Sequence, residues 1–431
     1  MHKKILLYLL DKPFVMKKHL TFLFLLLSYF SHSQSCTCEA ELDALYNTVL
    51  SLTSYKNNLA GKKYEEYKRT YEWLRKEAEK EKQKIPCFLI LAKLLEPVTD
   101  NSVTFSLGMY DDVKVSPNDQ FFKEKQVFFM SEFAKYNIKA HVDTDSIENI
   151  LRNKPESDIE GIYYKAKLRV GLYRTKARDS LAGVILDSDY PNWKKGDVAF
   201  LLYEKSPNHF TAIHSQYLTN QYYLQKHEKY INGRLAQGKW SKSVERDDIL
   251  LNGTGDKVKF DFKFVTSDIQ YVRLGYLASV MNYEKAEVFL GRVKDSLKSD
   301  NVIVDLRENS HGSEDVAKPF LKFLKKYSRK HDIYIIINAG IKGAAERLVA
   351  ELKGEERIHL LGEETSGILA YGYVDVVNSR LACGNYLFHS NNAEYMKLLK
   401  YEGSGITPDY VLNTDTDWVE QTITIIKNKH E

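Results

Sequence analysis

The chain has 431 residues, of which 43% are hydrophobic and 12% aromatic. This composition excludes a disordered protein and is sufficient for two or three domains with a sizeable core. The net charge of +4 is too small to decide for or against a nucleic-acid partner. The sequence has no Walker loop, no dinucleotide glycine fingerprint and no zinc-type cysteine spacing. We therefore expect no nucleic acid, no cofactor and no metal ion.

The N-terminus has the pattern of an export signal. Basic residues in "MKKH" (16–19) precede the uncharged run "LTFLFLLLSYF" (20–30), and small and polar residues follow in "SHSQS" (31–35). The apolar run is too short to span a bilayer comfortably. We therefore expect Met16 to be the true start and 1–34 to be removed on export to the periplasm, the cell envelope or the medium, leaving no stable membrane span. An uncleaved N-terminal anchor is the alternative.

Export changes how the four cysteines are interpreted, because disulfides persist in oxidising compartments. Either Cys36 or Cys38 could pair with Cys87 and tie the N-terminal segment to the first apolar helix. Cys383 lies in a predicted strand, where a small buried side chain is the simpler interpretation. The C-x-C pair supplies only two ligands, so it predicts no metal site.

Residues 35–158 are expected to be a helical N-terminal region. The segment 64–84 mixes both signs of charge with aromatic residues on one stripe, which is typical of an amphipathic helix. A more apolar helix follows over 85–98, ended by Pro97. Another helix or two is predicted over 119–155.

Residues 159–255 consist of short β-rich runs separated by turn residues, such as "DYPNWKKGD" (189–197). This pattern predicts an inserted β domain, a small antiparallel barrel or sandwich. Its many tyrosines are expected to pack within the sheet and not to form a ligand site.

Residues 256–431 alternate between apolar strands and helices, which is typical of an α/β core with helix-covered strands. The predicted strands are 269–277, 301–306, 333–338 and 357–362, and the predicted helices are 283–298, 315–330 and 343–352. The third helix follows its strand through a tight glycine-bearing loop, the layout in which several hydrolases present a nucleophile.

Four stretches in this part occur in a fixed order. They are "NVIVDLRENSHGS" (301–313), "INAGIKGAAERLVAEL" (337–352), "LLGEETSGILAYG" (360–372) and "GSGITPDYVL" (403–412). Together they resemble motifs of the tail-specific, C-terminal-processing serine protease family, which includes the tricorn-type peptidases. The resemblance covers about 266–431 and implies an exported peptidase with a protease-like α/β core, preceded by the helical region and the inserted β domain.

The resemblance also assigns the catalytic positions, and this sequence departs from the pattern at each of them. The family's nucleophilic serine corresponds to Gly343, and its lysine base corresponds to Ile368 in "TSGI" (365–368). The histidine of the tricorn-like branch corresponds to Ser102. Glycine has no nucleophilic or acid–base chemistry, so the resemblance predicts a catalytically degenerate member.

The loop that helps to bind the oxyanion in this family is altered as well, because His311 replaces the first of two glycines. The residues expected to line the polypeptide-binding site are Asn309, Ser310, His311, Gly312, Gly343 and Ala344. Ser366 with His311 could form a substitute catalytic pair if the two lay within hydrogen-bond reach. Loop serines, glutamates and histidines are more often caps or solvated groups, and Glu346 suits the first turn of its helix.

Three functional hypotheses follow. The first is an exported protein that binds polypeptide without cleaving it, and the second is an active serine-type endopeptidase with a relocated catalytic set. The third is an envelope scaffold that uses the fold only as structure. An open space beside Gly343 would favour binding over a scaffold role.

The export signal gives the first prediction. We expect the mature chain to begin between Gln34 and Cys36, because the apolar run ends at Phe30 and small residues follow it. N-terminal sequencing of protein recovered from the native host checks this. A mature chain that still begins with "MKKHLTFLF" would contradict it.

Overall fold

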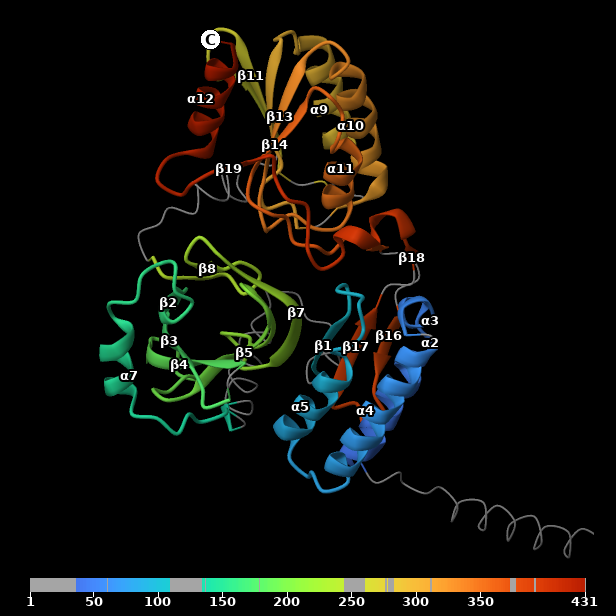
Figure 1. The fold of residues 1–431 in the computed structure, drawn as a ribbon, viewed down its shortest axis with the longest axis vertical. Coiled ribbons are helices and arrows are strands. Elements are labelled where there is room, and N and C mark those ends of the chain that lie inside the picture. Colours follow the sequence, from blue (N-terminus) through green and yellow to red (C-terminus); the bar gives the residue numbers. More distant parts are fainter. Residues whose placement is uncertain are drawn as a thin grey trace, which may run out of the picture.

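A computed structural model of the chain shows three parts: a helical part at the N-terminus, a β barrel and an α/β core (Figure 1). It describes residues 36–59, 61–108, 134–135, 137–177, 179–243, 260–275, 277, 283–310, 312–372, 377–390 and 393–430. None of the described helices combines the length and the apolar character that crossing a membrane requires.

The helical part contains α2 (Cys38–Ser51), α3 (Thr53–Asn58), α4 (Lys62–Ala78) and α5 (Lys84–Leu94). Charged residues cover most of α4, which buries Tyr67, Leu74 and Ala78 on one side. In contrast, α5 buries most of its side chains and ends before Pro97, as its composition predicts. The segment expected to be helical over 119–155 lies partly outside the described residues, and its described part contains α7 (Thr144–Leu151).

A sheet that the sequence did not predict completes this helical part. The strand β1 (Thr104–Leu107) pairs antiparallel with β17 (Tyr386–Ser390), which pairs with β16 (Val377–Arg380). Both β16 and β17 come from the C-terminal part of the chain and return to pack on the N-terminal helices (Figure 1). The rings of Phe88 on α5 and Phe105 on β1 stack 4.9 Å apart. This contact fixes the sheet against the helices.

The inserted domain is a closed antiparallel barrel. Its strands are β2 (Gly161–Lys165), β3 (Leu168–Arg174), β4 (Ser180–Ser188), β5 (Val198–Ser206), β6 (His209–Ser215), β7 (Tyr222–Ile231), β8 (Arg234–Leu235) and β9 (Trp240–Ser241). The order β7-β6-β5-β4-β3-β2-β9-β8 closes through the pairing of β7 with β8. Since β7 also pairs with β1, the barrel and the N-terminal sheet are hydrogen-bonded to each other.

The α/β core is built on a six-stranded sheet in the order β10-β11-β12-β13-β14-β19. Its strands are β10 (Phe260–Phe264), β11 (Ile269–Leu274), β12 (Asn301–Asp305), β13 (Asp332–Ile337), β14 (Ile358–Gly362) and β19 (Tyr410–Val411). Pairing is parallel from β11 to β19, and β10 is antiparallel to β11. Every residue of β11 and β12 is buried, as expected for strands that helices cover on both faces.

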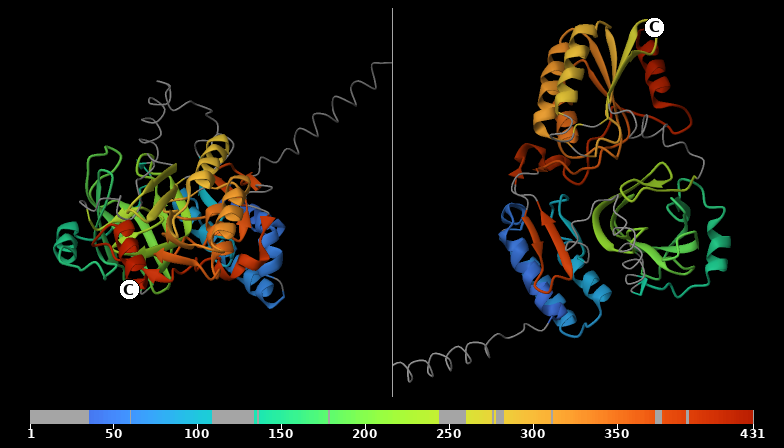
Figure 2. Two further views of the ribbon diagram at one scale, coloured as in Figure 1. Left: turned by 90° about the horizontal axis from the view of Figure 1, so that it is seen from above. Right: turned by 180° about the vertical axis from the view of Figure 1, so that it is seen from behind.

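Helices cover both faces of this sheet. One face carries α9 (Tyr283–Ser296), α10 (Glu314–Tyr327) and α11 (Ala344–Leu352), and the other carries α12 (Trp418–His430). Figure 2 shows the red C-terminal helix on the opposite side of the sheet from the orange helices. After β14 come β15 (Tyr371–Gly372), β18 (Ala393–Glu394) and the 3₁₀ helix η3 (Met396–Tyr401). The predicted fold class, an α/β core with a helical N-terminal region and an inserted antiparallel β domain, is confirmed.

One disulfide crosses the helical part. Cys38 and Cys87 are joined with their Cα atoms 5.6 Å apart, which is one of the two pairings that the sequence left open. The bond links the start of α2 to α5. Cys36 is an exposed free thiol, and Cys383 is half-buried in the turn between β16 and β17. The prediction that Cys383 lies within a strand is therefore wrong.

We expect the double variant Cys38→Ser/Cys87→Ser to lose about 3–4 kcal/mol of unfolding free energy, because the bond closes a long loop of the unfolded chain. The two cysteines are 49 positions apart in the sequence. Denaturant unfolding under non-reducing conditions measures the loss. Cys36→Ser, which leaves the bond in place, is the control and should unfold like the unmodified protein. Peptide mapping that found all four thiols free would contradict the prediction.

Candidate functional site

The strand-to-helix turn after β13 ends in a glycine held in a backbone conformation that disfavours side chains. Gly343 is the N-cap of α11, with φ 66° and ψ −134°. Apart from its chain neighbours, no described residue has an atom within 4 Å of where a Cβ on Gly343 would lie. A serine would therefore find space at this position but would carry backbone strain. The position that the motifs align with the family's serine is thus a glycine in a backbone conformation that disfavours a side chain.

Backbone hydrogen bonds bring three of the four motif stretches together around this turn. The Gly343 N–H donates to the carbonyl of Ile368 over 2.8 Å, and the Lys342 N–H donates to the carbonyl of Asn309 over 3.1 Å. The Ser366 N–H donates to the carbonyl of Ile341 over 3.0 Å. The nucleophile and base positions predicted from the motifs are therefore adjacent in the structure.

A buried carboxylate, that of Glu346 in the first turn of α11, holds residues 365–368 against the Gly343 turn. We call 365–368 the base loop, because the family's lysine aligns with Ile368. One of its oxygens accepts hydrogen bonds from the Thr365 hydroxyl (2.5 Å) and the Gly367 N–H (2.6 Å), and the other accepts one from the Ile368 N–H (3.0 Å). Burial raises the pKa of the Glu346 carboxyl to about 7, although these hydrogen bonds oppose the rise. The residue thus does more than face the helix dipole, because it fixes the whole loop.

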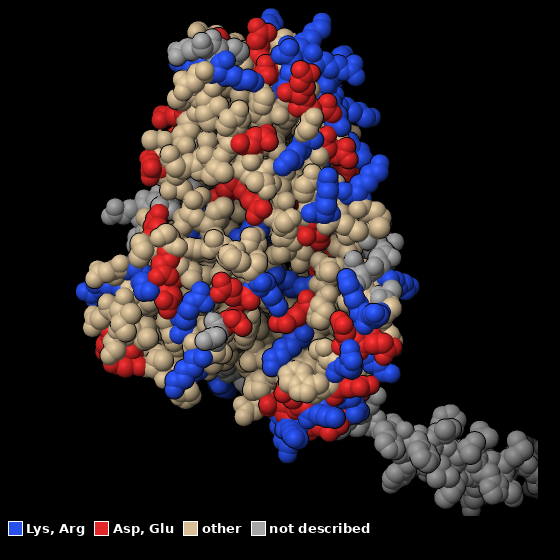
Figure 3. Space-filling model, viewed as in Figure 1, with Lys and Arg blue, Asp and Glu red and all other residues tan. Residues whose placement is uncertain are grey.

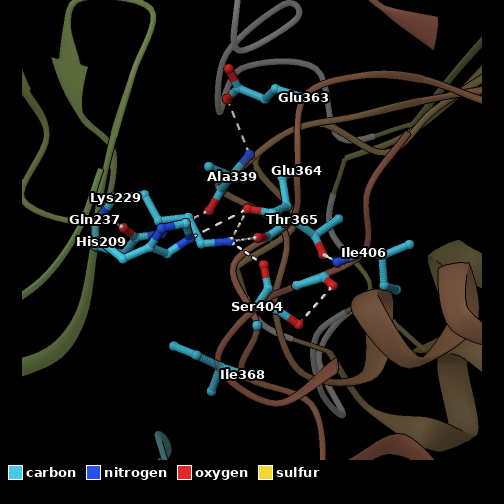
Figure 4. Close-up of polar contacts among 12 residues, drawn as sticks. His209, Lys229, Gln237, Ala339, Glu363, Glu364, Thr365, Ile368, Ser404 and Ile406 are labelled. Atoms are coloured by element: carbon cyan, nitrogen blue, oxygen red, sulfur yellow. Dashed lines mark hydrogen bonds and ion pairs between the residues drawn. The ribbon is translucent and has the colours of Figure 1, made fainter. Parts of the chain in front are cut away.

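The base loop itself offers no titratable group at the position of the family's lysine. The half-buried side chain there is that of Ile368, which is apolar (Figure 4). Two positions earlier, the hydroxyl oxygen of Ser366 is buried and has no hydrogen-bond partner among the described residues. His311, the partner considered for Ser366, lies outside the described residues.

The loop after β12 is anchored by a buried ion cluster. The carboxylate of Asp305 accepts hydrogen bonds from Arg273 (2.7 Å), from Arg307 (2.7 and 3.0 Å) and from the hydroxyl of Tyr271 (2.8 Å). Burial alone would raise the pKa of Asp305, but the two guanidinium groups outweigh it and hold that pKa below its usual range. The strand end and the start of the loop are therefore rigidly placed.

The residues expected to bind polypeptide lie around this loop, in different environments. The side-chain amide of Asn309 is buried, donates to the Leu274 carbonyl and accepts the Leu277 N–H, so it serves the fold. Gly312 lies against α11, because a Cβ there would come within 2.8 Å of the Cβ of Ala344. Ser310 is half-buried beside them.

Ser102, at the position of the tricorn-type histidine, belongs to a different polar cluster. Its hydroxyl donates to the buried carboxylate of Asp100 over 2.5 Å. The adjacent Asn101 N–H donates to Glu402, whose other oxygen accepts the N–H groups of Leu369 and Ala370. Glu402 thereby ties the segment around Ser102 to the end of the base loop.

Sequence reasoning missed the side chains that the barrel contributes to the site. The ammonium group of Lys229, on β7, donates to the Glu364 carboxylate (2.9 Å) and to the carbonyls of Thr365 (2.7 Å) and Ser404 (2.6 Å), as Figure 4 shows. His209 on β6 lies 3.6 Å from the same carboxylate. Only the acidic pair at 363–364 in the sequence could have signalled a cationic partner.

The neighbouring residue, Glu363, connects the core to the barrel in a second place. Glu363 is buried and pairs with Arg234 on β8, while it also accepts hydrogen bonds from Asn232 (2.9 Å) and the Ala339 N–H (3.1 Å). Gln237 donates to the carbonyl of Ala339 over 3.3 Å. The barrel therefore contacts the segments that follow the carboxyl ends of β13 and β14.

Lys229 does not provide a replacement base here. Lys229 is buried, and burial lowers its pKa despite the neighbouring carboxylate of Glu364. All three of its N–H donors have acceptors, so its ammonium form is an anchor and not a free base. Within the described ranges, no group of three His, Cys, Asp or Glu residues is arranged to hold a metal ion.

Neither a model of a known protein family nor a curated protein matches the chain. Several solved structures do match the chain. The photosystem II D1 C-terminal processing protease is 12% identical, covers 89% of this chain and 95% of its own, and has a TM-score of 0.37. Mature CPAF is 10% identical over 90% of this chain and 97% of its own, with a TM-score of 0.42. The tricorn protease is 12% identical over 91% of this chain and 37% of its own, with a TM-score of 0.41. The processing protease and the tricorn protease carry names from the family that the four motifs resemble.

The Glu346 cluster predicts a distinctive pH dependence. A folded-state pKa of about 7, above the ordinary value of 4.5, means that the folded protein binds this proton more tightly than the unfolded chain. The stability contributed by the bound proton is present below about pH 4.5 and is lost as the pH rises through about 7. We expect Glu346→Gln to be less stable at pH 5, because its amide cannot accept every loop hydrogen bond. This deficit should shrink toward pH 8.

Denaturant unfolding at pH 5, 6, 7 and 8 measures the difference between the two proteins. Glu356→Gln, at an exposed position just after α11, is the matched control and should show a constant difference near zero. A Glu346→Gln deficit that stayed constant or grew with pH would contradict the assignment.

Proposed function

We propose that this chain is an exported, protease-like protein that binds a polypeptide segment beside the Gly343 turn and does not cleave it. The observation that carries the proposal is the turn itself. Gly343 stands at the position that the motifs align with the family's serine, in a backbone conformation that would strain a side chain, and it has none. The N-terminal signal pattern supports the exported location.

The chemistry of the site supports a role without catalysis. Peptide cleavage of the serine type needs a nucleophilic oxygen and a base within hydrogen-bond reach of it. The base position holds Ile368, whose apolar side chain takes up no proton. The nearby ionisable groups of Glu346 and Lys229 are already engaged in hydrogen bonds that hold the fold. Losing members of a catalytic set costs many powers of ten in rate.

The backbone of the site supports retained binding. The first N–H groups of a helix lack intrahelical acceptors, and Gly343 offers no side chain to cap those of α11. Such N–H groups can hold a carbonyl or carboxylate of a bound chain. The space beside Gly343 favours binding over a purely structural role, in which a neighbouring side chain would fill the place of the nucleophile.

An endopeptidase with a relocated catalytic set is the second candidate. One observation favours it: the buried hydroxyl of Ser366 has no partner among the described residues. A nucleophile in this place would need a base. The residue at the position of the tricorn-type histidine, Ser102, donates its own proton to Asp100 and cannot serve as one.

The proposal predicts that the purified protein binds unfolded casein and an extended peptide library but does not cleave them, and that a fluorophosphonate probe does not label it. Size analysis of the substrate after prolonged incubation and in-gel fluorescence check these outcomes. Peptidase activity that disappears in Ser366→Ala or His311→Ala would overturn the proposal in favour of the relocated set. If the protein neither binds nor cleaves these substrates, the scaffold role becomes the remaining hypothesis.

Reintroducing the catalytic groups tests the inferred ancestry of the turn. We expect Gly343→Ser alone to remain unlabelled, because its serine lacks a base. Gly343→Ser with Ile368→Lys should give weak labelling, since burial lowers the pKa of a lysine toward the range where it accepts a proton. The control is Gly354→Ser with Ile368→Lys, because Gly354 also has a positive φ and open space but lies beyond α11. Equal labelling of the control would contradict the assignment of the turn.

A further inference from the structure

The outer surface of the α/β core contains a groove of about 1380 Å³ between α9 and α10. Its lining includes Tyr283 and Lys294 from α9, and a longer series from α10 and the residues just after it. No role in the Gly343 turn accounts for this groove, because it lies on the face of the helices that points away from the sheet.

Cationic side chains follow one edge of the groove at a regular interval. Lys318, Lys322 and Lys326 are four residues apart on α10, and Lys330 continues the series just beyond the helix end. Residues four apart lie on the same face of a helix, about 6 Å from each other along its axis. On α10 itself, Lys318 to Lys326 therefore form a row about 12 Å long. Figure 3 shows Lys and Arg gathered at the upper right, where α10 lies in Figure 1.

Positive charge exceeds negative charge in the lining of the groove, where Glu284 and Asp315 are the acidic members and the basic members are Lys294, Lys318, Lys322, Lys326, Arg329 and Lys330. Lys318, Lys322 and Lys326 are exposed and form no ion pair with a described residue. In contrast, Lys325 on the neighbouring face of α10 lies 3.5 Å from Glu351 and 3.6 Å from Glu355. Unpaired like charges in a row repel one another, which favours an anionic partner at this edge.

The floor of the groove has a different character from its edge. Pro319, Phe323 and Tyr327 line it, and the rings of Phe323 and Tyr327 lie 5.8 Å apart. His331 extends the series and stacks on Tyr327 with the ring centres 4.2 Å apart. The groove thus presents an aromatic and apolar floor beside a cationic edge.

We infer that this groove binds an acidic segment of a polypeptide, in which carboxylates meet the lysine row and apolar side chains meet the aromatic floor. A concave groove suits a single chain better than a flat membrane surface. A polypeptide can supply both carboxylates and apolar side chains, whereas a phosphate polymer supplies charge at every unit and would leave the floor unused. This inference is independent of the proposed function at Gly343, although the groove begins at Ser313, just after the loop of the first motif.

The probe for the test is a fluorescein-labelled peptide of about twelve residues that repeats Glu-Glu-Phe, long enough to span the lysine row. Its affinity is measured by fluorescence anisotropy with the full mature protein. We expect binding that weakens as salt rises. We also expect loss of at least about tenfold in affinity for the triple variant Lys318→Glu/Lys322→Glu/Lys326→Glu, because three attractive contacts become repulsive.

The control is Lys63→Glu/Lys68→Glu/Lys76→Glu, which makes the same charge change at three exposed positions of α4. It should bind the peptide like the unmodified protein, and circular dichroism should show that both triple variants are folded. The matching Gln-Gln-Phe peptide should bind at least about tenfold more weakly, since it lacks the carboxylates. Equal binding of the acidic peptide by both triple variants would overturn the proposal.

Two further outcomes assign the ligand class. A DNA oligonucleotide or heparin that bound more tightly than the acidic peptide, and only when the lysine row was intact, would make the groove a general polyanion site and overturn the polypeptide assignment. Preferential binding to anionic phospholipid vesicles would overturn it in favour of a membrane surface. Gly343→Ser should bind the acidic peptide unchanged, which separates this groove from the site of the proposed function.

Discussion

The geometry of the site depends above all on one buried carboxylate. Glu346 accepts three hydrogen bonds from the loop 365–368, while its own helix begins at Gly343. A buried carboxylate is costly unless such donors surround it, and its raised pKa records that cost. The same contacts place the carbonyl of Ile368 where it accepts the Gly343 N–H. The two positions that the motifs align with the family's serine and lysine, Gly343 and Ile368, are therefore held side by side by these hydrogen bonds.

The barrel also holds the loop after β14 in place, from outside the α/β core. Lys229 and Arg234 reach from neighbouring strands to the consecutive carboxylates of Glu364 and Glu363 at the end of β14. A buried ion pair adds stability only where further hydrogen bonds satisfy its remaining donors and acceptors. The Lys229 pair meets this condition, because the carbonyls of Thr365 and Ser404 accept its remaining N–H donors. The Arg234 pair meets it only in part: the Ala339 N–H donates to Glu363, but Nε of Arg234 is buried without a partner among the described residues. The inserted domain is thus part of the site, and not only an appendage to it.

Local patterns predicted the core well and the long-range assembly poorly. The apolar runs at 301–306 and 333–338 became β12 and β13, since a strand covered on both faces must be apolar throughout. Four short motifs placed Gly343 next to Ile368. The pairing of β1 with β17 joins residues almost three hundred positions apart, and no local periodicity encodes such a partner. The contact of Lys229 with the base loop was missed for the same reason, because a lysine in an alternating strand is normally interpreted as solvent-facing.

If the turn once carried a serine, as we propose, its retention with glycine has a physical explanation. A side chain at a positive φ is strained, so an active serine there would have to be held by the surrounding structure. Glycine adopts the same φ of 66° without that strain. The hydrogen bonds from Gly343 to Ile368 and from Lys342 to Asn309 are made by the backbone and are indifferent to the side chain. Replacing a nucleophile by glycine therefore removes the chemistry and relaxes the backbone, while the surface that a polypeptide would contact keeps its shape.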